Sequence, residues 1–218
     1  MKRHHLFFLC LAAVSFGSCR SSTAPPLPDP VTIQDLFPLA HQDYWAYELT
    51  YYDMYDTLRI VTTDVDEVIQ TTNFNGQESY LMDYRKPARQ LYYYYAGSDL
   101  MVTEKNSAAE PILRYPMHQG EVMIRRDTTY SSGIRDRNIL KFTGASDTIK
   151  VTAGIFSCYH YQAIRFGGKP DLSDTSEVEH LYYAPGVGLI KRVRYQYTQD
   201  HREKKIIFTQ ELMNYNVL

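Results

Sequence analysis

Hydrophobic and polar residues alternate with a period of two along most of this chain beyond residue 43. In "VGLIKRVRYQYTQ" (187–199), Leu189 and Val193 fall on one face, and Arg192 and Arg194 fall on the other. A strand that alternates in this way has one buried face and one solvated face. We therefore expect the two arginines to point into water.

The same alternation predicts twelve strands separated by short turns. Their ranges are 44–52, 57–72, 78–84, 89–96, 99–105, 121–130, 137–143, 147–152, 157–166, 176–184, 187–199 and 203–214. The turn signals between them are Asn75-Gly76, Gly97-Ser98, Ser132-Gly133, Gly144 and Gly167-Gly168. Strands at this close spacing predict an all-β fold, in which an antiparallel meander forms one strongly curved sheet, a barrel or a half-barrel.

Two irregularities are expected within this pattern. In the range 57–72 the alternation changes phase between Ile60 and Val65, which predicts a β-bulge in that strand. Residues 32–37 are expected to form one short helical turn, with Thr32 as its N-cap. The fold should therefore contain little helix.

The stretch "HLYYAPGVGLIKR" (180–192) contains two glycines that could suggest a phosphate-binding loop. Such a loop is followed by a helix whose N-terminus meets the phosphates, whereas here the period-two pattern continues after Leu189. We therefore expect Pro185 and Gly186 to form the centre of a type II turn. Gly188 should mark a bulge or a close approach of the backbone.

The N-terminus has the layout of a secretory signal, with Lys2 and Arg3 before an apolar stretch and small residues up to Cys19. Phe16-Gly17-Ser18-Cys19 resembles a bacterial lipobox, in which the cysteine is lipidated after residues 1–18 are removed. The alternative is an ordinary signal that leaves Cys19 as a free thiol. Residues 19–30, with four prolines, predict an extended tether, and residues 31–218 predict a single domain.

Lipidation of Cys19 would anchor the chain in a membrane, because several acyl chains make such attachment effectively permanent. Arg20 follows the cysteine, in place of the aspartate that resembles an inner-membrane retention signal. We therefore expect an outer-membrane lipoprotein of the cell envelope that faces the periplasm.

Charge and cysteine content narrow the class of protein further. The chain has 23 basic and 25 acidic residues, and loss of Lys2 and Arg3 with the signal takes its formal charge from −2 to −4. Nucleic-acid binding calls for a basic stripe, so we expect no nucleic-acid partner. The basic clusters "IKRVRY" and "HREKK" are typical of a solvated sheet face, with a binding patch as the alternative. Cys158 alone remains in the mature domain, which excludes an intramolecular disulfide.

No arrangement of residues in the sequence indicates catalysis or a cofactor. The histidines of the mature chain, His41, His118, His160, His180 and His201, are not spaced like metal ligands, so we expect no metal site. Cys158 lies in mid-strand, where a cysteine usually behaves as a small buried hydrophobe. We therefore expect no catalytic residues and no cofactor.

The tyrosine run "QLYYYYAG" is the strongest candidate for a binding surface. Alternation places Tyr92 and Tyr94 on one face and Tyr93 and Tyr95 on the other. Tyrosine suits contacts with lipids, glycans or proteins, because it combines a large apolar surface with a polar tip. Cross-strand aromatic packing within the sheet is the alternative.

Three segments resemble a group of largely uncharacterised bacterial lipoproteins: "FPLAHQDYWAYE" (37–48), "VTAGIFSCYHYQ" (151–162) and "YYAPGVGLIKR" (182–192). The pattern of that group reads F-P-L-x-x-G-x-x-W-x-Y, V-x-A-G-x-F and Y-x-A-P-G-V-G-L-V-K. Gln42 or Asp43 stands where the group has a glycine. The resemblance implies an exported all-β domain, similar to half-barrel lipoprotein carriers, and carries no catalytic residues across.

Two classes of function remain. The first is a non-catalytic binding module for a hydrophobic ligand, glycan, peptide or envelope protein. The second is an envelope enzyme whose site has no signature in the sequence. The absence of a catalytic constellation favours the binding module.

Overall fold

The computed structural model describes residues 31–53, 59–85, 88–167, 175–197 and 204–218. The predicted signal, the lipidation site Cys19 and the proline-rich tether lie outside these residues, as does His201. Among the described residues, no helix is both long and apolar enough to cross a membrane.

The described chain consists of one short helix and twelve strands. They are α1 (Ile33–Leu36), β1 (Tyr44–Tyr52), β2 (Arg59–Phe74), β3 (Gln77–Arg85), β4 (Ala88–Ala96), β5 (Asp99–Thr103), β6 (Glu110–Arg114), β7 (Val122–Thr129), β8 (Arg135–Val151), β9 (Gly154–Gly167), β10 (Thr175–Ala184), β11 (Gly188–Tyr197) and β12 (Lys204–Asn216).

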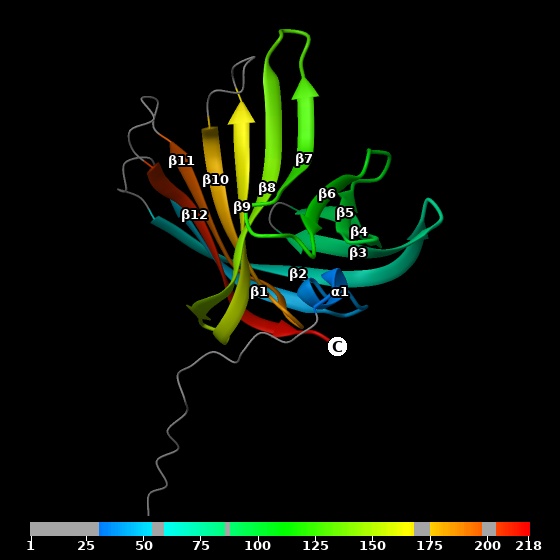
Figure 1. Ribbon diagram of the computed structural model, residues 1–218. Coiled ribbons are helices and arrows are strands. Elements are labelled where there is room, and N and C mark those ends of the chain that lie inside the picture. The colour runs from blue at the N-terminus through cyan, green and yellow to red at the C-terminus, as the bar shows by residue number, and fades with distance from the viewer. Residues whose placement is uncertain (1–30, 54–58, 86–87, 168–174, 198–203) are drawn as a thin grey trace, which may run out of the picture.

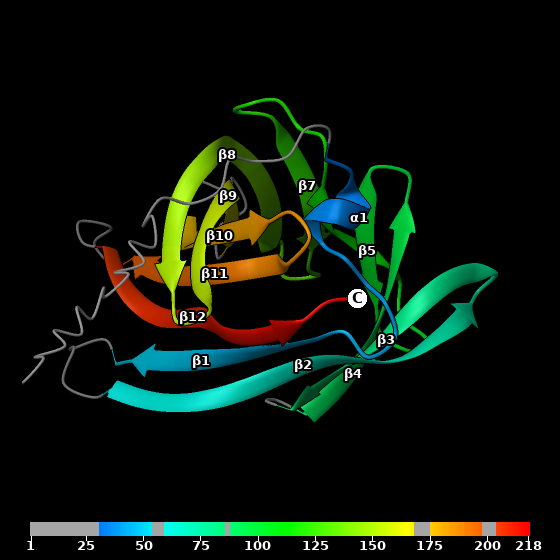
Figure 2. The same cartoon turned by 90° about the horizontal axis from the view of Figure 1, so that it is seen from below.

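All twelve strands belong to one antiparallel sheet with the order β6-β5-β4-β3-β2-β1-β12-β11-β10-β9-β8-β7. Strands that are consecutive in the chain pair with each other, except β6 and β7, and β1 also pairs with β12, which joins the two ends of the meander. The sheet curls into a nearly closed barrel whose two edges are β6 and β7 (Figures 1 and 2). The predicted all-β meander with little helix is confirmed.

Tight turns of the predicted kind connect the strands. Asn75 and Gly76, with φ of 54° and 81°, join β2 to β3 as the two central residues of a hairpin loop. Positive φ at both positions matches the right-handed twist of the flanking strands. Gly97 (φ 63°) begins the loop between β4 and β5, and Gly133 (φ 79°) lies in the loop between β7 and β8.

The turn predicted at Gly144 is wrong. β8 continues through Gly144 as one strand, where the two ranges 137–143 and 147–152 were expected. Its pairing with β9 shifts register on both sides of Gly144, so the long β8–β9 hairpin bends there and β8 also lies against β11 and β12 (Figure 2). Because Gly144 has no side chain, β8 can bend sharply at this residue, and its pairing with β9 keeps it extended on both sides.

Two further details differ from expectation. β6 was not predicted, because Pro111 interrupts its pattern; a proline is tolerated there since β6 is an edge strand. The bulge of β2 lies at Ile69, between Val68 and Gln70, and its pairing with β1 is regular over the predicted region.

Helix α1 lies on the concave side of the sheet (Figure 1). As predicted, Thr32 caps it: the Thr32 Oγ1 accepts from the Asp35 N–H at 3.2 Å, and the Asp35 carboxylate accepts from the Thr32 N–H at 2.8 Å. This reciprocal capping box stabilises a helix too short to persist alone. Its apolar side chains Ile33 and Leu36 are buried in the core of the barrel.

Candidate ligand-binding cavity

The concave face of the sheet encloses a cavity of about 650 Å³. Side chains of β1 to β7 and of β10 to β12 line it, most of them at alternate positions as the pleat requires: on β1 these are Tyr47, Leu49 and Tyr51. The apolar part of the lining is formed by Phe37, Leu49, Met82, Leu91, Val102, Ile112, Leu181, Leu189 and Phe208. A volume of this size lies in the range of roughly 300 to 1,000 Å³ that is typical of small-molecule sites.

Phe37, which follows α1, forms one wall of the cavity and links it to the core. Its ring stacks on Trp45 and Tyr93, with centroids 5.9 and 6.1 Å away, and its carbonyl accepts a hydrogen bond from the Tyr95 hydroxyl at 2.7 Å. These contacts fix the ring between the cavity and Trp45, the only tryptophan of the chain, which is 1% exposed.

The turn between β10 and β11 packs against the same region. The Val187 N–H donates to the Ala184 carbonyl at 3.1 Å across Pro185 and Gly186, and Gly186 has a φ of 72°, as a type II turn requires. Gly188 has a φ of 99° and lies so close to the indole of Trp45 that a Cβ would be 3.3 Å from its Nε1. The backbone thus approaches Trp45 closely at Gly188.

Glu179 of β10 lies at the centre of an ion-pair cluster inside the cavity. Its carboxylate accepts from Arg192 at 2.6 Å and from Arg194 at 2.5 Å, and Arg194 also contacts Glu177 at 3.1 Å. Burial alone would raise the pKa of Glu179, but the two guanidinium groups outweigh it and lower that pKa. The guanidinium carbons of both arginines also lie 5.6 Å from the centre of the Phe208 ring, within range of a cation–π interaction.

The positions of Arg192 and Arg194 correct the sequence analysis. We expected them on a solvated face, and the structure places both on the wall of the cavity. The predicted alternation holds from Lys191 onward, but the face that carries the arginines is the concave one. Leu189, expected on the opposite face, also lines the cavity, because the pairing with β10 shifts register and leaves Ile190 as an extra residue. The opposite face of the strand carries Lys191, whose ammonium group pairs with Glu211 at 2.7 Å.

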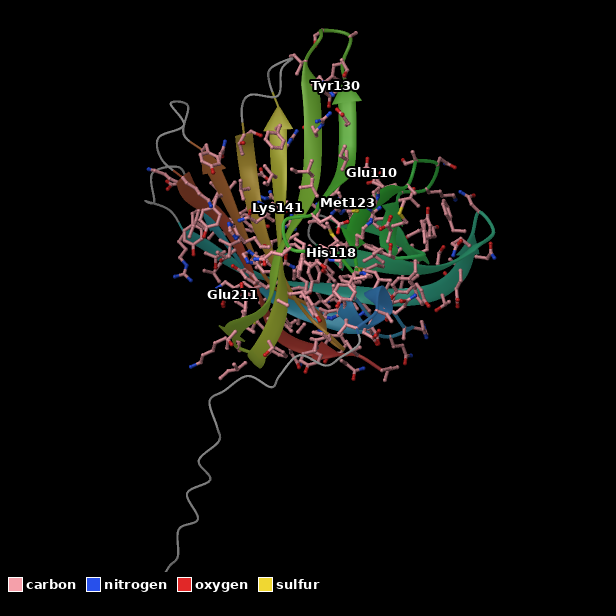
Figure 3. The ribbon with its side chains drawn as sticks, viewed as in Figure 1. Glu110, His118, Met123, Tyr130, Lys141 and Glu211 are labelled. Carbon is pink, nitrogen blue, oxygen red and sulfur yellow. The ribbon has the colours of Figure 1, made fainter. Side chains whose placement is uncertain are left out.

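Arg125 and Arg126 of β7 are adjacent in sequence, and both line the cavity. Successive residues of a regular strand point to opposite faces, but the pairing of β7 with β8 shifts between Ile124 and Arg126, so that Arg125 is the extra residue of a bulge. The guanidinium of Arg126 donates to Glu110 of β6 at 2.6 and 2.8 Å. This ion pair connects the two edge strands, and Figure 3 shows Glu110 where β6 faces β7.

Asp66 of β2 is the most strongly perturbed carboxyl group of the cavity wall. Burial, and next the charge of Asp64, raise its pKa to about 7, against the opposing effect of Arg192 and Arg89. Asp66 therefore changes its charge near neutral pH, next to a buried pair of hydrogen-bonded hydroxyl groups from Tyr84 and Tyr93.

The structure does not bring the four candidate tyrosines together. Tyr93 lines the cavity, and Tyr95 points to the same side and holds Phe37. Tyr92 packs on the ring of Phe74 at 4.5 Å, which is the cross-strand packing alternative. Of the run, only Tyr93 belongs to the cavity wall.

A second group of polar residues lies outside the cavity, on β8, β9, β10 and β12. His160 contacts Asp147 at 3.1 Å and His180 at 2.9 Å, and Lys204 lies 3.4 Å from the other nitrogen of His180. Burial lowers the pKa of both histidines, that of His180 to about 4. No group of three or more metal-binding side chains occurs in the described part of the chain.

Cys158 is fully buried and makes a long contact with the carbonyl of Phe156. Burial raises the pKa of its thiol to about 12, so the thiol is protonated at neutral pH. A buried, protonated thiol is a poor nucleophile, because the thiolate is the reactive form.

Sequence reasoning missed Arg125, Asp66 and Glu179. The sequence shows two adjacent arginines, Arg125 and Arg126, in "IRRD", but a period-two pattern places only one of them on a given face of the strand. The bulge that turns both inward depends on pairing with β8. Asp66 and Glu179 lie in acidic stretches that are typical of solvated faces, and only closure of the sheet turns them inward.

The fold and its internal cavity define a nearly closed, cavity-containing β-barrel. No family model matches the sequence, and no curated protein matches it. Two solved structures are similar. One is a presumed exported protein with a YmcC-like fold from Bacteroides fragilis, 13% identical, with a TM-score of 0.53 over 83% of this chain and 98% of the other. The second is a presumed lipoprotein from Parabacteroides distasonis, 12% identical, with a TM-score of 0.50 over 87% of this chain and all of the other. At these identities the likeness shows a shared fold.

Proposed function

We propose that this protein is an exported, lipid-anchored component of the bacterial cell envelope that binds an amphiphilic ligand inside its β-barrel. The cavity of about 650 Å³ supports this most directly, because it combines apolar walls with buried charged groups. Membrane attachment is supported by the lipobox-like Cys19, and the two proteins of similar fold are described as a presumed exported protein and a presumed lipoprotein.

We infer binding rather than catalysis, because the thiol of Cys158 is buried and protonated, and the ionised groups of the cavity are mostly held in ion pairs. The alternative of an envelope enzyme is favoured by one observation, the pKa of about 7 at Asp66, since groups that titrate near neutrality suit proton transfer. Asp66 would then act as an acid or base on the bound molecule.

Native mass spectrometry tests the binding function. The exported Cys19→Ala chain, purified without detergent, should carry a bound small molecule that is released on unfolding and that organic extraction identifies. Release of the same molecule unchanged after incubation supports binding, whereas its steady conversion to a product supports the enzyme.

A matched pair of variants locates the ligand. Ala108 lines the cavity and its neighbour Ala109 does not, so Ala108→Trp should reduce occupancy while Ala109→Trp leaves it unchanged. A ligand-free native protein that also binds no added amphiphile would contradict the proposal.

A further inference from the structure

Arg125 differs from the other arginines of β7 and β11 that line the cavity. Arg192 and Arg194 share Glu179, and Arg126 pairs with Glu110. In the described part of the chain, the guanidinium of Arg125 makes no hydrogen bond or ion pair, and its side chain projects from a bulge onto the cavity wall.

The charges that act on Arg125 leave it without a counter-ion. Glu179 and Glu110 attract it, but each is already held by another arginine, and Arg192 repels it. Burial lowers the pKa of Arg125, which shows that its charge is poorly solvated, although an arginine remains protonated in proteins. Arg125 is half-buried, and an unpaired charge that is partly removed from water destabilises the fold, so its place on the cavity wall suits an anion from outside the chain.

The surroundings of Arg125 suit an anionic group joined to an apolar body. Tyr183 of β10 is close enough for Arg125 and Arg192 to lower the pKa of its hydroxyl, which burial nevertheless keeps at about 12. This hydroxyl is therefore a hydrogen-bond donor at neutral pH. Leu181, two residues earlier on the same face of β10, belongs to the apolar wall together with Phe208.

We propose that Arg125, with Arg192 and the hydroxyl of Tyr183, binds the carboxylate or phosphate head of a single-chain amphiphile whose apolar chain lies along the cavity wall. This inference rests on the proposed binding function and specifies its ligand. The planar guanidinium suits both heads, since it donates two parallel hydrogen bonds to either.

Calorimetric titration of the Cys19→Ala chain with laurate, dodecyl phosphate and 1-dodecanol tests the inference, because the three probes share one alkyl chain. We expect at least one anionic probe to bind about 10- to 100-fold more tightly than the alcohol, which corresponds to charge-assisted hydrogen bonds. Whichever of laurate and dodecyl phosphate binds more tightly identifies the head group.

Substitution of single arginines assigns this preference to one side chain. Arg125→Gln should remove most of the preference and leave binding of 1-dodecanol unchanged, whereas Arg165→Gln, with the same change of charge on β9 and outside the cavity lining, should keep it. Arg125→Lys should restore part of it, which shows that loss in the glutamine variant is not misfolding.

Each outcome bears on a separate claim. Equal affinity for all three probes, or equal losses in Arg125→Gln and Arg165→Gln, would overturn the anion site and leave the binding function standing. Failure of all three probes to bind would count against the binding function itself.

Discussion

Single residues on the concave face carry charges that a closed barrel normally excludes. Asp66, Glu179 and Arg125 all line the cavity, but only Glu179 has its charge compensated by neighbouring ion pairs. Asp66 responds to burial by holding its proton up to a pKa of about 7, and Arg125 stays charged. Both responses follow from the cost of placing an unpaired charge in a poorly solvated site.

The raised pKa of Asp66 predicts a pH-dependent contribution to stability. In the unfolded chain its pKa is near 3.8, so between about pH 4 and pH 7 the unfolded state loses a proton that the folded state retains. The folded state therefore loses stability as the pH rises through this window. Asp66→Asn should be more stable than the parent protein at pH 8 by about 2 to 4 kcal/mol, and about equal to it at pH 4.

Urea unfolding at pH 4, 6 and 8 measures this difference. Asp83→Asn, on neighbouring β3 and outside the cavity lining, should show no such trend. A difference between Asp66→Asn and the parent protein that does not change with pH would mean that Asp66 is ionised in the folded protein.

Gln42, in the turn before β1, has a φ of 75°, a left-handed conformation that glycine adopts without strain. The turn therefore has a positive φ at a residue that carries a side chain.

At the level of elements, the β10–β11 turn and α1 act together. The Gly186 N–H donates to the Asp35 carbonyl at 2.6 Å, and the indole of Trp45 donates to the Val187 carbonyl at 2.5 Å. These two hydrogen bonds connect the turn to the helix and to β1. The glycines of the motif therefore serve packing between elements that are far apart in the sequence.

Replacing Gly188 should disturb this packing. Gly188→Ala combines a strained φ of 99° with a methyl group 3.3 Å from Trp45, and should cost about 2 to 3 kcal/mol of stability. Gly76→Ala is a matched control, because Gly76 has a φ of 81° and a methyl group there would meet no atom within 4 Å. It should cost about 1 to 2 kcal/mol, the strain alone.

Thermal unfolding compares the two variants, and the fluorescence of Trp45 reports on the contact itself. The emission of Trp45 should change in Gly188→Ala and stay the same in Gly76→Ala. Equal stability losses and an unchanged emission would show that the close approach at Gly188 has no energetic role.

The whole molecule is a meander closed by pairing of its first and last strands, with its edges at β6 and β7. An ion pair between Arg126 and Glu110, rather than a ladder of backbone hydrogen bonds, connects these edges. The cavity is therefore bordered by one seam that lacks strand pairing. Such a seam is the part of the barrel wall that can separate at the lowest cost, since exposed ion pairs contribute about 1 kcal/mol or less.

Membrane attachment is a prediction for the whole protein that depends on Cys19. Cys19→Ala should move the protein from the membrane fraction to the soluble fraction, because loss of the acyl chains removes the hydrophobic anchor. Cell fractionation followed by immunoblotting measures this, with Cys158→Ala, which leaves Cys19 intact, as the control that stays with the membranes. A Cys19→Ala protein that still sediments with membranes would disprove lipid anchoring at this residue.

The sequence by itself determined most of the strands, most of their turns and the N-cap at Thr32, because period-two alternation and turn chemistry are local properties. It also indicated the all-β meander. Only the tertiary structure decided which face of each strand lies on the concave side of the sheet. The alternation of apolar and polar residues is the same whether the polar face meets water or a cavity. The inward turn of Arg125 and the continuity of β8 through Gly144 likewise depend on pairing with neighbouring strands. The candidate site therefore follows from closure of the sheet, which no single stretch of sequence encodes.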